Sequence, residues 1–175
     1  MKIEFGCGNS VTKGFVGCDI RKFSGVKYLC DCWDINKHVK ENSVDEIRSR
    51  HMFEHLTYAQ GKKSLRSWHK ILKNGGKVQL NMPDLYYHVK EYIRNYDNRK
   101  MKHISDSFVH AIAGIYGWQK ETEDSSHFTA HANLWGIHKS GYDEISLKKL
   151  IKSLGYKDFI RNPNDAWHLD VTFYK

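Results

Sequence analysis

Short apolar runs, each closed by a polar or turn-forming residue, recur towards both ends of the chain. Ile3 and Phe5 flank a glutamate, and near the other end Leu169, Val171 and Phe173 alternate with polar residues. Runs of this kind, with turn residues between them, predict β-strands. The strands predicted in this way cover residues 3–5, 15–18, 26–30, 43–49, 77–82, 156–160 and 168–174.

Two helices with an apolar stripe lie between these strands. The first begins at a Thr57-x-x-Gln60 capping box, and Gly75-Gly76 is its predicted C-terminal cap. Its apolar positions follow one another at steps of three and four residues: Leu65, Trp68 and Leu72. The second helix runs from Asp143, as N-cap, to Leu154.

Strands that alternate with helices favour an open α/β sheet. Residues 85–142 interrupt this alternation, because they hold two further helical stretches, near 85–96 and 109–115, and then a polar segment rich in His and Trp. We therefore predict one domain over residues 1–175, with residues 85–142 as a lid inserted over the carboxyl edge of the sheet.

A chain of 175 residues, 40% of them hydrophobic, can form a core of its own, which argues against a disordered protein. No apolar run reaches 18 residues, and MKIEFGCGNS lacks the apolar core of a signal peptide, so we expect a cytoplasmic protein without a membrane span. The net charge of +8 favours anionic partners. Lysine outnumbers arginine, the better residue for reading phosphates and bases, so nucleic acid is the weaker partner prediction.

The spacing of cysteine and histidine predicts no metal site. The four cysteines include a C-x-C pair but no second pair at zinc-site spacing: Cys7, Cys18, Cys30 and Cys32. We interpret them as small, reduced side chains at strand ends. His127 and His131 have the spacing of two ligands on one helix face, but no carboxylate or cysteine follows them at a known ligand spacing.

The first three predicted strands end in residues that suit a nucleoside. Gly6-Cys7-Gly8 follows the first strand, Asp19 ends the second and Asp31 the third. Ligands of open α/β sheets bind beyond the carboxyl ends of the strands, where glycine lets the backbone approach closely. A carboxylate after the second strand can accept hydrogen bonds from both ribose hydroxyls, and one after the third can accept from an adenine amino group. The three features in this order predict a nucleoside site.

At these stretches the chain resembles the class I S-adenosylmethionine-dependent methyltransferases, and among them the small type 11 branch. The resemblance lies in EFGCGN, GFVGCDI, LCDCWD, NSVDEIRSRHMFEHL and WHKILKNGGKVQLNMPDL, and more weakly in HKSGYDEISLKKLIKSLGY. It implies a Rossmann-like seven-stranded mixed sheet with strand order 3-2-1-4-5-7-6, strand seven antiparallel, and S-adenosylmethionine as the cofactor.

The resemblance also implies roles for individual residues of this sequence. The methionine part of the cofactor would be lined by Glu4, Gly6, Cys7 and Gly8. Its ribose and adenine would be held by Asp19, Ile20, Asp31 and Cys32. The sulfur that carries the methyl group would lie near His51, Met52 and Phe53.

Two features depart from the family's pattern. Only residues 9–14 join the first two strands, whereas a parallel crossover normally needs a dozen residues or more. We therefore expect the usual first helix to be missing or reduced to a turn. Arg50 stands where the family often has a small residue. It could pair with an acid or reach the carboxylate of the cofactor, and the sequence leaves both options open.

Together these features predict an enzyme that transfers a methyl group from S-adenosylmethionine to a small molecule, with a sugar or another hydroxylated metabolite as the leading acceptor. His51 and His138 are the predicted catalytic bases, because neutral imidazole can take a proton from a hydroxyl near pH 7. A nicotinamide oxidoreductase is disfavoured, since Val11 occupies the place of the third glycine of G-x-G-x-x-G. The remaining alternative is a non-catalytic or nucleic-acid-binding protein on a methyltransferase scaffold.

Overall fold

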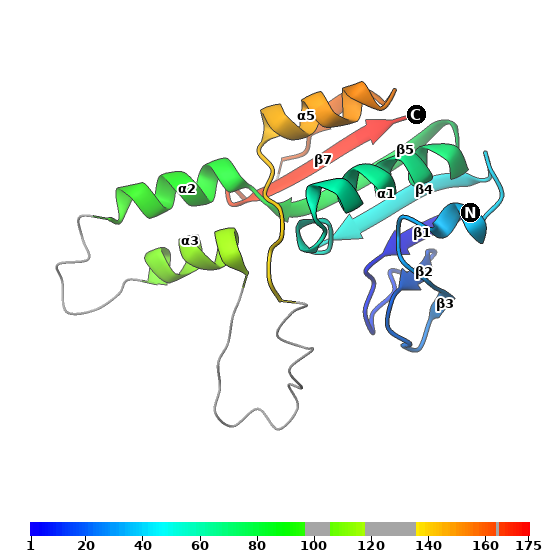
Figure 1. Ribbon diagram of the computed structural model, residues 1–175, viewed down its shortest axis with the longest axis horizontal. Helices are drawn as coiled ribbons and strands as arrows, with labels where there is room; N and C mark the ends of the chain where they lie inside the picture. Colours follow the sequence, from blue (N-terminus) through cyan, green and yellow to red (C-terminus); the bar gives the residue numbers. More distant parts are fainter. Residues whose placement is uncertain (97–105, 118–135, 164) are drawn as a thin grey trace.

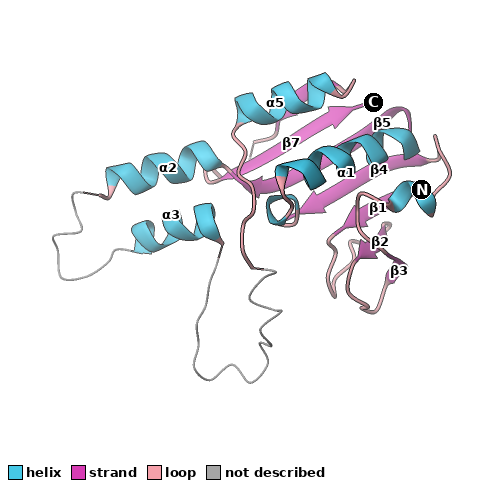
Figure 2. Ribbon diagram, in the orientation of Figure 1, coloured by secondary structure: helices cyan, strands magenta, loops and turns pink. Residues whose placement is uncertain are grey.

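Seven strands form one mixed sheet in the order β3-β2-β1-β4-β5-β7-β6 (Figure 2). The computed structural model describes residues 1–96, 106–117, 136–163 and 165–175. The strands are β1 (Lys2–Phe5), β2 (Val16–Asp19), β3 (Val26–Leu29), β4 (Val44–Arg50), β5 (Leu72–Pro83), β6 (Lys157–Arg161) and β7 (His168–Tyr174). β7 is antiparallel to both of its neighbours, and the other pairs are parallel. The predicted strand order is confirmed.

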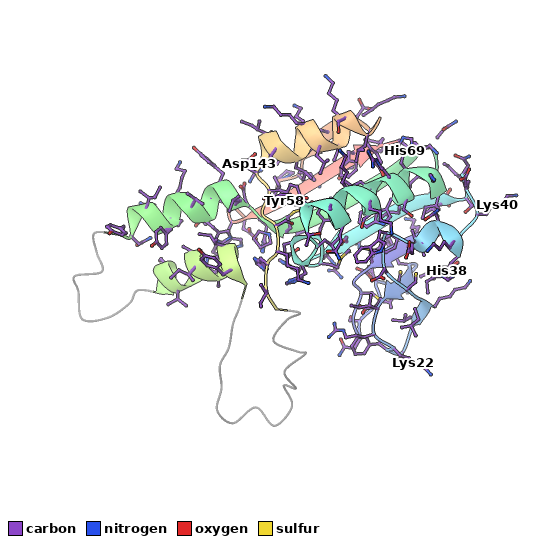
Figure 3. All side chains as sticks on the ribbon, in the orientation of Figure 1. Lys22, His38, Lys40, Tyr58, His69 and Asp143 are labelled. Carbon is purple, nitrogen blue, oxygen red and sulfur yellow. The ribbon has the colours of Figure 1, made fainter. Side chains whose placement is uncertain are left out.

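Two helices, α1 (Tyr58–Ile71) and α5 (Glu144–Ser153), lie side by side over the same face of the sheet (Figure 1). Both begin at the predicted residues. The Thr57 side chain accepts the backbone N–H of Gln60, and Asp143, at the start of α5, caps that helix in the same way (Figure 3). The other helical segments within the described ranges are η1 (Ile35–Lys37), η2 (Phe53–His55), α2 (Leu85–Arg94) and α3 (Asp106–Tyr116).

The predicted C-terminal cap of the first helix is wrong. α1 ends at Ile71, because Leu72 already has an extended backbone and pairs with Val44 of β4. Gly75, with φ of 76°, instead makes an irregularity within β5, where its N–H donates to the carbonyl of Lys175 at 3.1 Å. Pairing in the sheet therefore takes precedence over the local turn signal of the two glycines.

The hydrophobic core lies between the sheet and these two helices. Phe5 of β1 stacks on Trp68 of α1 with ring centroids 4.7 Å apart, and Tyr156 meets Phe173 of β7 edge to face. The alternating residues of β7 confirm the predicted period, since Leu169, Val171 and Phe173 are fully buried. Burial of these rings and branched side chains is the main source of stability of such a layer.

The opposite face of the sheet carries polar side chains. Glu46 of β4 forms ion pairs with Lys2 at 2.7 Å and with Lys77 at 3.0 Å. Residues 6–15, which join β1 to β2, contain no helix and lie beside this face, as the contact between Phe15 and the guanidinium of Arg48 shows. The expected loss of the first crossover helix is confirmed.

α2 and α3 extend beyond the end of the sheet at which β4 finishes (Figure 1). They belong to residues 85–142, for which a lid is predicted, and that role stays a prediction. Residues 97–105 and 118–135 of this stretch lie outside the described residues, and with them the His127 and His131 pair. No helix in the described ranges is both long enough and apolar enough to cross a bilayer.

Candidate functional site

The turn after β1 requires glycine. Gly6 and Gly8 both have a left-handed backbone, with φ of 64° and 55°. A Cβ atom on Gly6 would lie 2.3 Å from Cγ and 2.5 Å from Cβ of Met52, closer than carbon atoms can approach. Residues with a side chain strongly disfavour this conformation, so glycine keeps the turn tight against Met52, the second residue after β4.

Asp19 sits at the end of β2 with a nearly buried carboxylate, 4% exposed. Its Oδ2 accepts the backbone N–H of Gly8 and its Oδ1 that of Arg21, both at 2.9 Å. A carboxylate offers about four lone-pair sites, so each oxygen keeps one for a further donor. The side chain is thus held in place while it can still bind two hydroxyls.

A cavity of about 380 Å³, which we call the strand-end cavity, opens at this edge of the sheet. It brings together seven of the residues predicted for the cofactor: Gly6, Asp19, Ile20, Asp31, Cys32, His51 and Met52. Trp33, His55 and Lys139 also line it and were not predicted. Trp33 directly follows a predicted site residue, which was a usable signal. Lys139 directly follows the predicted base His138, so its position in the sequence carried the same kind of signal.

The other predicted cofactor residues lie beside this cavity or behind its wall. Glu4 is buried on the polar side of β1, where its carboxylate accepts from the N–H and hydroxyl of Thr12 and pairs with Arg50 at 3.1 Å. Cys7 and Gly8 form the turn next to the cavity. Phe53 is 1% exposed and packs between the rings of Trp68 and Tyr142 in the core. Of the two options for Arg50, the pairing with an acid is thus present.

All four cysteines are free thiols. The Sγ atoms of Cys18 and Cys30 lie 3.8 Å apart, and both residues line the strand-end cavity. Burial is the main cause that raises the pKa of the Cys18 thiol, and it raises that of Cys32 to about 12. These thiols therefore stay protonated near neutral pH, which fits small buried side chains better than reactive nucleophiles.

A second cavity, of about 420 Å³, adjoins the first. We call it the histidine cavity, because its lining includes six imidazoles: His51, His55, His88, His110, His138 and His168. It shares His51 and His55 with the strand-end cavity. Both predicted bases therefore face one space, although one follows β4 and the other precedes α5. His55 lies in η2, within the stretch quoted for the resemblance, whereas the chain positions of His88, His110 and His168 gave no signal, since they come from α2, α3 and β7.

His51 is held at the boundary of the two cavities. Its φ of 47° is left-handed, and its N–H donates to the carbonyl of Asn81 at the end of β5 at 2.9 Å. Its Nδ1 lies 3.5 Å from Oε1 of Glu54. The hydrogen bond to this carboxylate raises the pKa of His51 against the opposing effect of burial. A non-glycine residue in this backbone region is uncommon and occurs often at functional sites.

His55 and His138 face each other with ring centroids 5.1 Å apart. Nδ1 of His55 lies 3.0 Å from the carbonyl oxygen of Ile137, and Nδ1 of His138 lies 3.0 Å from that of Gly114. Because a carbonyl only accepts, each neutral ring carries its proton on Nδ1 and keeps a lone pair on Nε2. Burial lowers the pKa of His138, so this imidazole is neutral near pH 7.

His88 closes the far side of the histidine cavity. It is 2% exposed, and burial together with the neighbouring His110 lowers its pKa to about 4. A Cβ atom on Gly114 of α3 would lie 2.1 Å from Nδ1 of His88, so α3 can approach α2 only with a glycine here. His88 is consequently uncharged at neutral pH.

The fold built from these elements is shared with solved methyltransferase structures. A SAM-dependent methyltransferase from Archaeoglobus fulgidus has a TM-score of 0.58 at 13% identity, over 99% of this chain and 85% of that one. An S-adenosylmethionine-dependent methyltransferase from Mesorhizobium loti has a TM-score of 0.58 at 13% identity, over 99% and 90%. A third structure is the 1,6-didemethyltoxoflavin-N1-methyltransferase of Burkholderia thailandensis, solved with 1,6-didemethyltoxoflavin and S-adenosylhomocysteine. Its TM-score is 0.58 at 12% identity, and the match covers 99% of this chain and 70% of that one.

The chain therefore has the fold of the S-adenosylmethionine-dependent methyltransferases, as its resemblance to class I of these enzymes implied. No protein-family model and no curated protein matches the sequence, and the narrower assignment to the type 11 branch stays a prediction.

Proposed function

We propose that this protein transfers a methyl group from S-adenosylmethionine to a small hydroxylated molecule. The observation that carries the proposal is the strand-end cavity, in which Gly6, Asp19 and Asp31 line one space of about 380 Å³ at the ends of successive strands. Such a cavity can hold a nucleoside at the edge where open α/β sheets bind their ligands. The shared fold of the solved methyltransferases supports the same cofactor.

Different residues of this cavity suit different parts of the cofactor. Asp19 keeps two lone pairs for the ribose hydroxyls, Asp31 can accept from the adenine amino group, and Ile20 offers an apolar surface to the base. Gly6 lets the chain approach the methionine part. Glu4 acts indirectly in this proposal, because its carboxylate fixes the loop at Thr12 and does not line the cavity.

The acceptor would bind in the histidine cavity, which adjoins the first and shares His51 with it. Imidazole rings offer hydrogen-bond donors, and those that are neutral near pH 7, such as His88 and His138, offer acceptors as well, so this lining suits a hydroxylated molecule such as a sugar. S-adenosylmethionine supplies the methyl group on its sulfonium. The chain itself orients the acceptor, excludes water and takes the proton of the reacting hydroxyl, and positioning accounts for most of the rate.

His51 is the first choice for this base. Glu54 orients its ring through Nδ1, which leaves Nε2 free to take a proton. His138, the second candidate, is neutral near pH 7 and has Nε2 available. The two imidazoles belong to the same cavity, so either can meet an acceptor that lies there.

The proposal is tested by titrating the full chain with S-adenosylhomocysteine in a calorimeter. One molecule should bind per chain. Asp19→Ala should weaken binding by about 2–4 kcal/mol, because two ribose hydroxyls lose a buried, charged acceptor. Asp34→Ala is the matched control: this acid lies close by in sequence, at the start of η1, but is not among the cavity-lining residues, so the affinity should hold. Absence of binding, or equal affinity in Asp19→Ala, would remove the cofactor assignment.

A panel of hydroxylated small molecules with a labelled methyl donor then tests the acceptor. Transfer to at least one sugar or related hydroxylated compound is expected. Cofactor binding without transfer to any member, together with binding of an RNA or DNA panel that weakens as salt increases, would favour the non-catalytic alternative.

A further inference from the structure

Three side chains of metal-ligand type meet on the wall of the histidine cavity. Glu54 and His55 are consecutive residues of η2, and His138 joins them from a segment more than eighty residues further along the chain. Each side chain offers one ligand atom, and the three atoms lie within 4.8 Å of one another. This is the one such group in the part of the chain that the structure describes.

Both imidazoles are already oriented as metal ligands usually are. A metal-bound histidine typically donates its second ring N–H to a carbonyl or carboxylate, which fixes the ring and its tautomer. Here the carbonyls of Ile137 and Gly114 accept from Nδ1 of His55 and His138, each at 3.0 Å. The nitrogen that remains on each ring, Nε2, is the one with a free lone pair.

Glu54 supplies the independent observation. Its side chain is 4% exposed, and its Oε1 faces Nδ1 of His51. Its Oε2 is buried without any hydrogen-bond partner among the described residues. A buried carboxylate oxygen without a donor or a cation is strongly unfavourable. Among the described side chains, His51 is the only ion-pair partner of Glu54, so the second oxygen still lacks a positive charge.

We propose that Glu54, His55 and His138 bind one divalent transition-metal ion, with Zn²⁺ as the ion that this donor set fits. Two imidazoles and one carboxylate are a known three-ligand set for zinc, and they leave a fourth position open. With metal–ligand bonds of about 2.1 Å in tetrahedral geometry, the donor atoms would lie about 3.4 Å apart, so the cluster would contract on binding.

The position of this site suggests its use. An ion on the wall of the histidine cavity could polarise a hydroxyl of the acceptor and lower its pKa, which makes the oxygen a better nucleophile. It would also occupy the lone pair of His138 and leave His51 as the base. This use rests on the proposed function, whereas the metal site does not.

The test uses the full chain, stripped of metal with a chelator and titrated with Zn²⁺ alone in competition with a chromophoric chelator. One equivalent of Zn²⁺ should bind with micromolar affinity or better. Glu54→Gln and His138→Ala should each weaken binding by about 100-fold or more, since each removes a ligand. His168→Ala is the matched control, because this imidazole lines the same cavity but lies outside the cluster, and it should bind Zn²⁺ like the wild type.

X-ray absorption of the wild-type chain loaded with Zn²⁺ keeps the test decisive if a variant does not fold. Two imidazole ligands and a carboxylate are expected. Fewer than two imidazoles, no binding of Zn²⁺, or equal binding by the wild type and both variants would overturn the metal site. The failures remain distinguishable: binding of S-adenosylhomocysteine without Zn²⁺ refutes the metal site alone, and the reverse refutes the proposed cofactor alone.

Discussion

The two cavities at the carboxyl edge of the sheet are assembled in different ways. Among the described residues, all that line the strand-end cavity except Lys139 lie between residues 6 and 60, at the ends of β1 to β4 and in the segments that follow them. The histidine cavity takes its imidazoles from the segment after β4, α2, α3, the segment before α5 and β7. One cavity is thus a consequence of local strand-end sequence, and the other exists only because the fold brings distant segments together.

Their chemistry differs as well. The strand-end cavity offers carboxylates and tightly turned backbone, which bind a ligand without changing it. The histidine cavity offers side chains that can hold or move a proton, and Glu54, the one acid among its described lining residues, contacts His51. We therefore expect the first cavity to determine cofactor affinity and the second to determine the rate of transfer.

The largest expected effect is a loss of methyl-transfer rate when a residue of the histidine cavity is replaced, with little change in cofactor affinity. His51→Ala should lower the methyl-transfer rate about 10²–10⁴-fold, because a general base contributes that much. The affinity for S-adenosylhomocysteine should fall only modestly, whereas Asp19→Ala should lose affinity and keep most of its rate at saturating cofactor. Steady-state kinetics and calorimetry on both variants measure this split.

His38→Ala serves as the control, since His38 lies at the end of the sheet away from α2 and α3 (Figure 3). It should leave both quantities unchanged. If His51→Ala kept the full rate, the transfer would depend on positioning alone, and a double variant with His138→Ala would decide whether either imidazole acts as a base.

The difference between the cavities also explains what the sequence could predict. Asp19 and Asp31 were found because each closes an apolar run, and the order of such runs places their ends at one edge of a parallel sheet. His88, His110 and His168 carry no comparable pattern, since their meeting depends on how α2 and α3 pack. Sequence spacing likewise predicted no metal site, because Glu54 and His138 are far apart in the chain.

The fold was predictable for the same physical reason. The apolar periodicity of β7 and the caps at Thr57 and Asp143 are local, and they appear in the structure as predicted. The cap at Gly75 failed because a competing, non-local interaction, the pairing of Leu72 with Val44, ends the helix earlier. Local sequence patterns therefore predict the ends of helices correctly unless the pairing of distant strands competes with them.

The next largest expected effect is a loss of folding stability when the glycine turn beside the strand-end cavity is altered. Gly6→Ala should lower the free energy of unfolding by about 2–5 kcal/mol, because it combines a strained left-handed backbone with a clash against Met52. Gly14→Ala isolates the backbone contribution. Gly14 lies in the same connection with φ of 86° and has nothing within 4 Å of an added Cβ, so about 1–2 kcal/mol is expected. Urea unfolding measures both, and equal losses would show that the close approach of Met52 is unimportant.

A smaller, pH-dependent effect should arise in the histidine cavity. Burial and His110 lower the pKa of His88 to about 4 from 6.5, so the unfolded chain binds this proton more readily than the folded one. The stabilisation is complete above pH 6.5 and decreases as the pH falls towards 4. Between pH 7 and pH 5 the wild type should lose about 1–2 kcal/mol more stability than His88→Gln, in which the titrating group is absent. Equal losses in urea unfolding at the two pH values would mean that His88 is not desolvated as described.

The smallest expected changes in stability and cofactor affinity are those of a variant at Arg50, and they test the role of this side chain. Its guanidinium is 54% exposed and pairs with the buried Glu4, whose carboxylate also accepts two hydrogen bonds from Thr12. Arg50→Gln should therefore cost only about 1 kcal/mol of stability, since Glu4 keeps other donors. The affinity for S-adenosylhomocysteine should stay within about twofold, because the arginine is already engaged on the polar side of β1 and does not line the strand-end cavity. Arg66→Gln, on the exposed side of α1, should change neither quantity. A tenfold loss of affinity in Arg50→Gln alone would show that this side chain turns to the carboxylate of the cofactor, and the strand-end cavity would then extend across the loop that Glu4 holds.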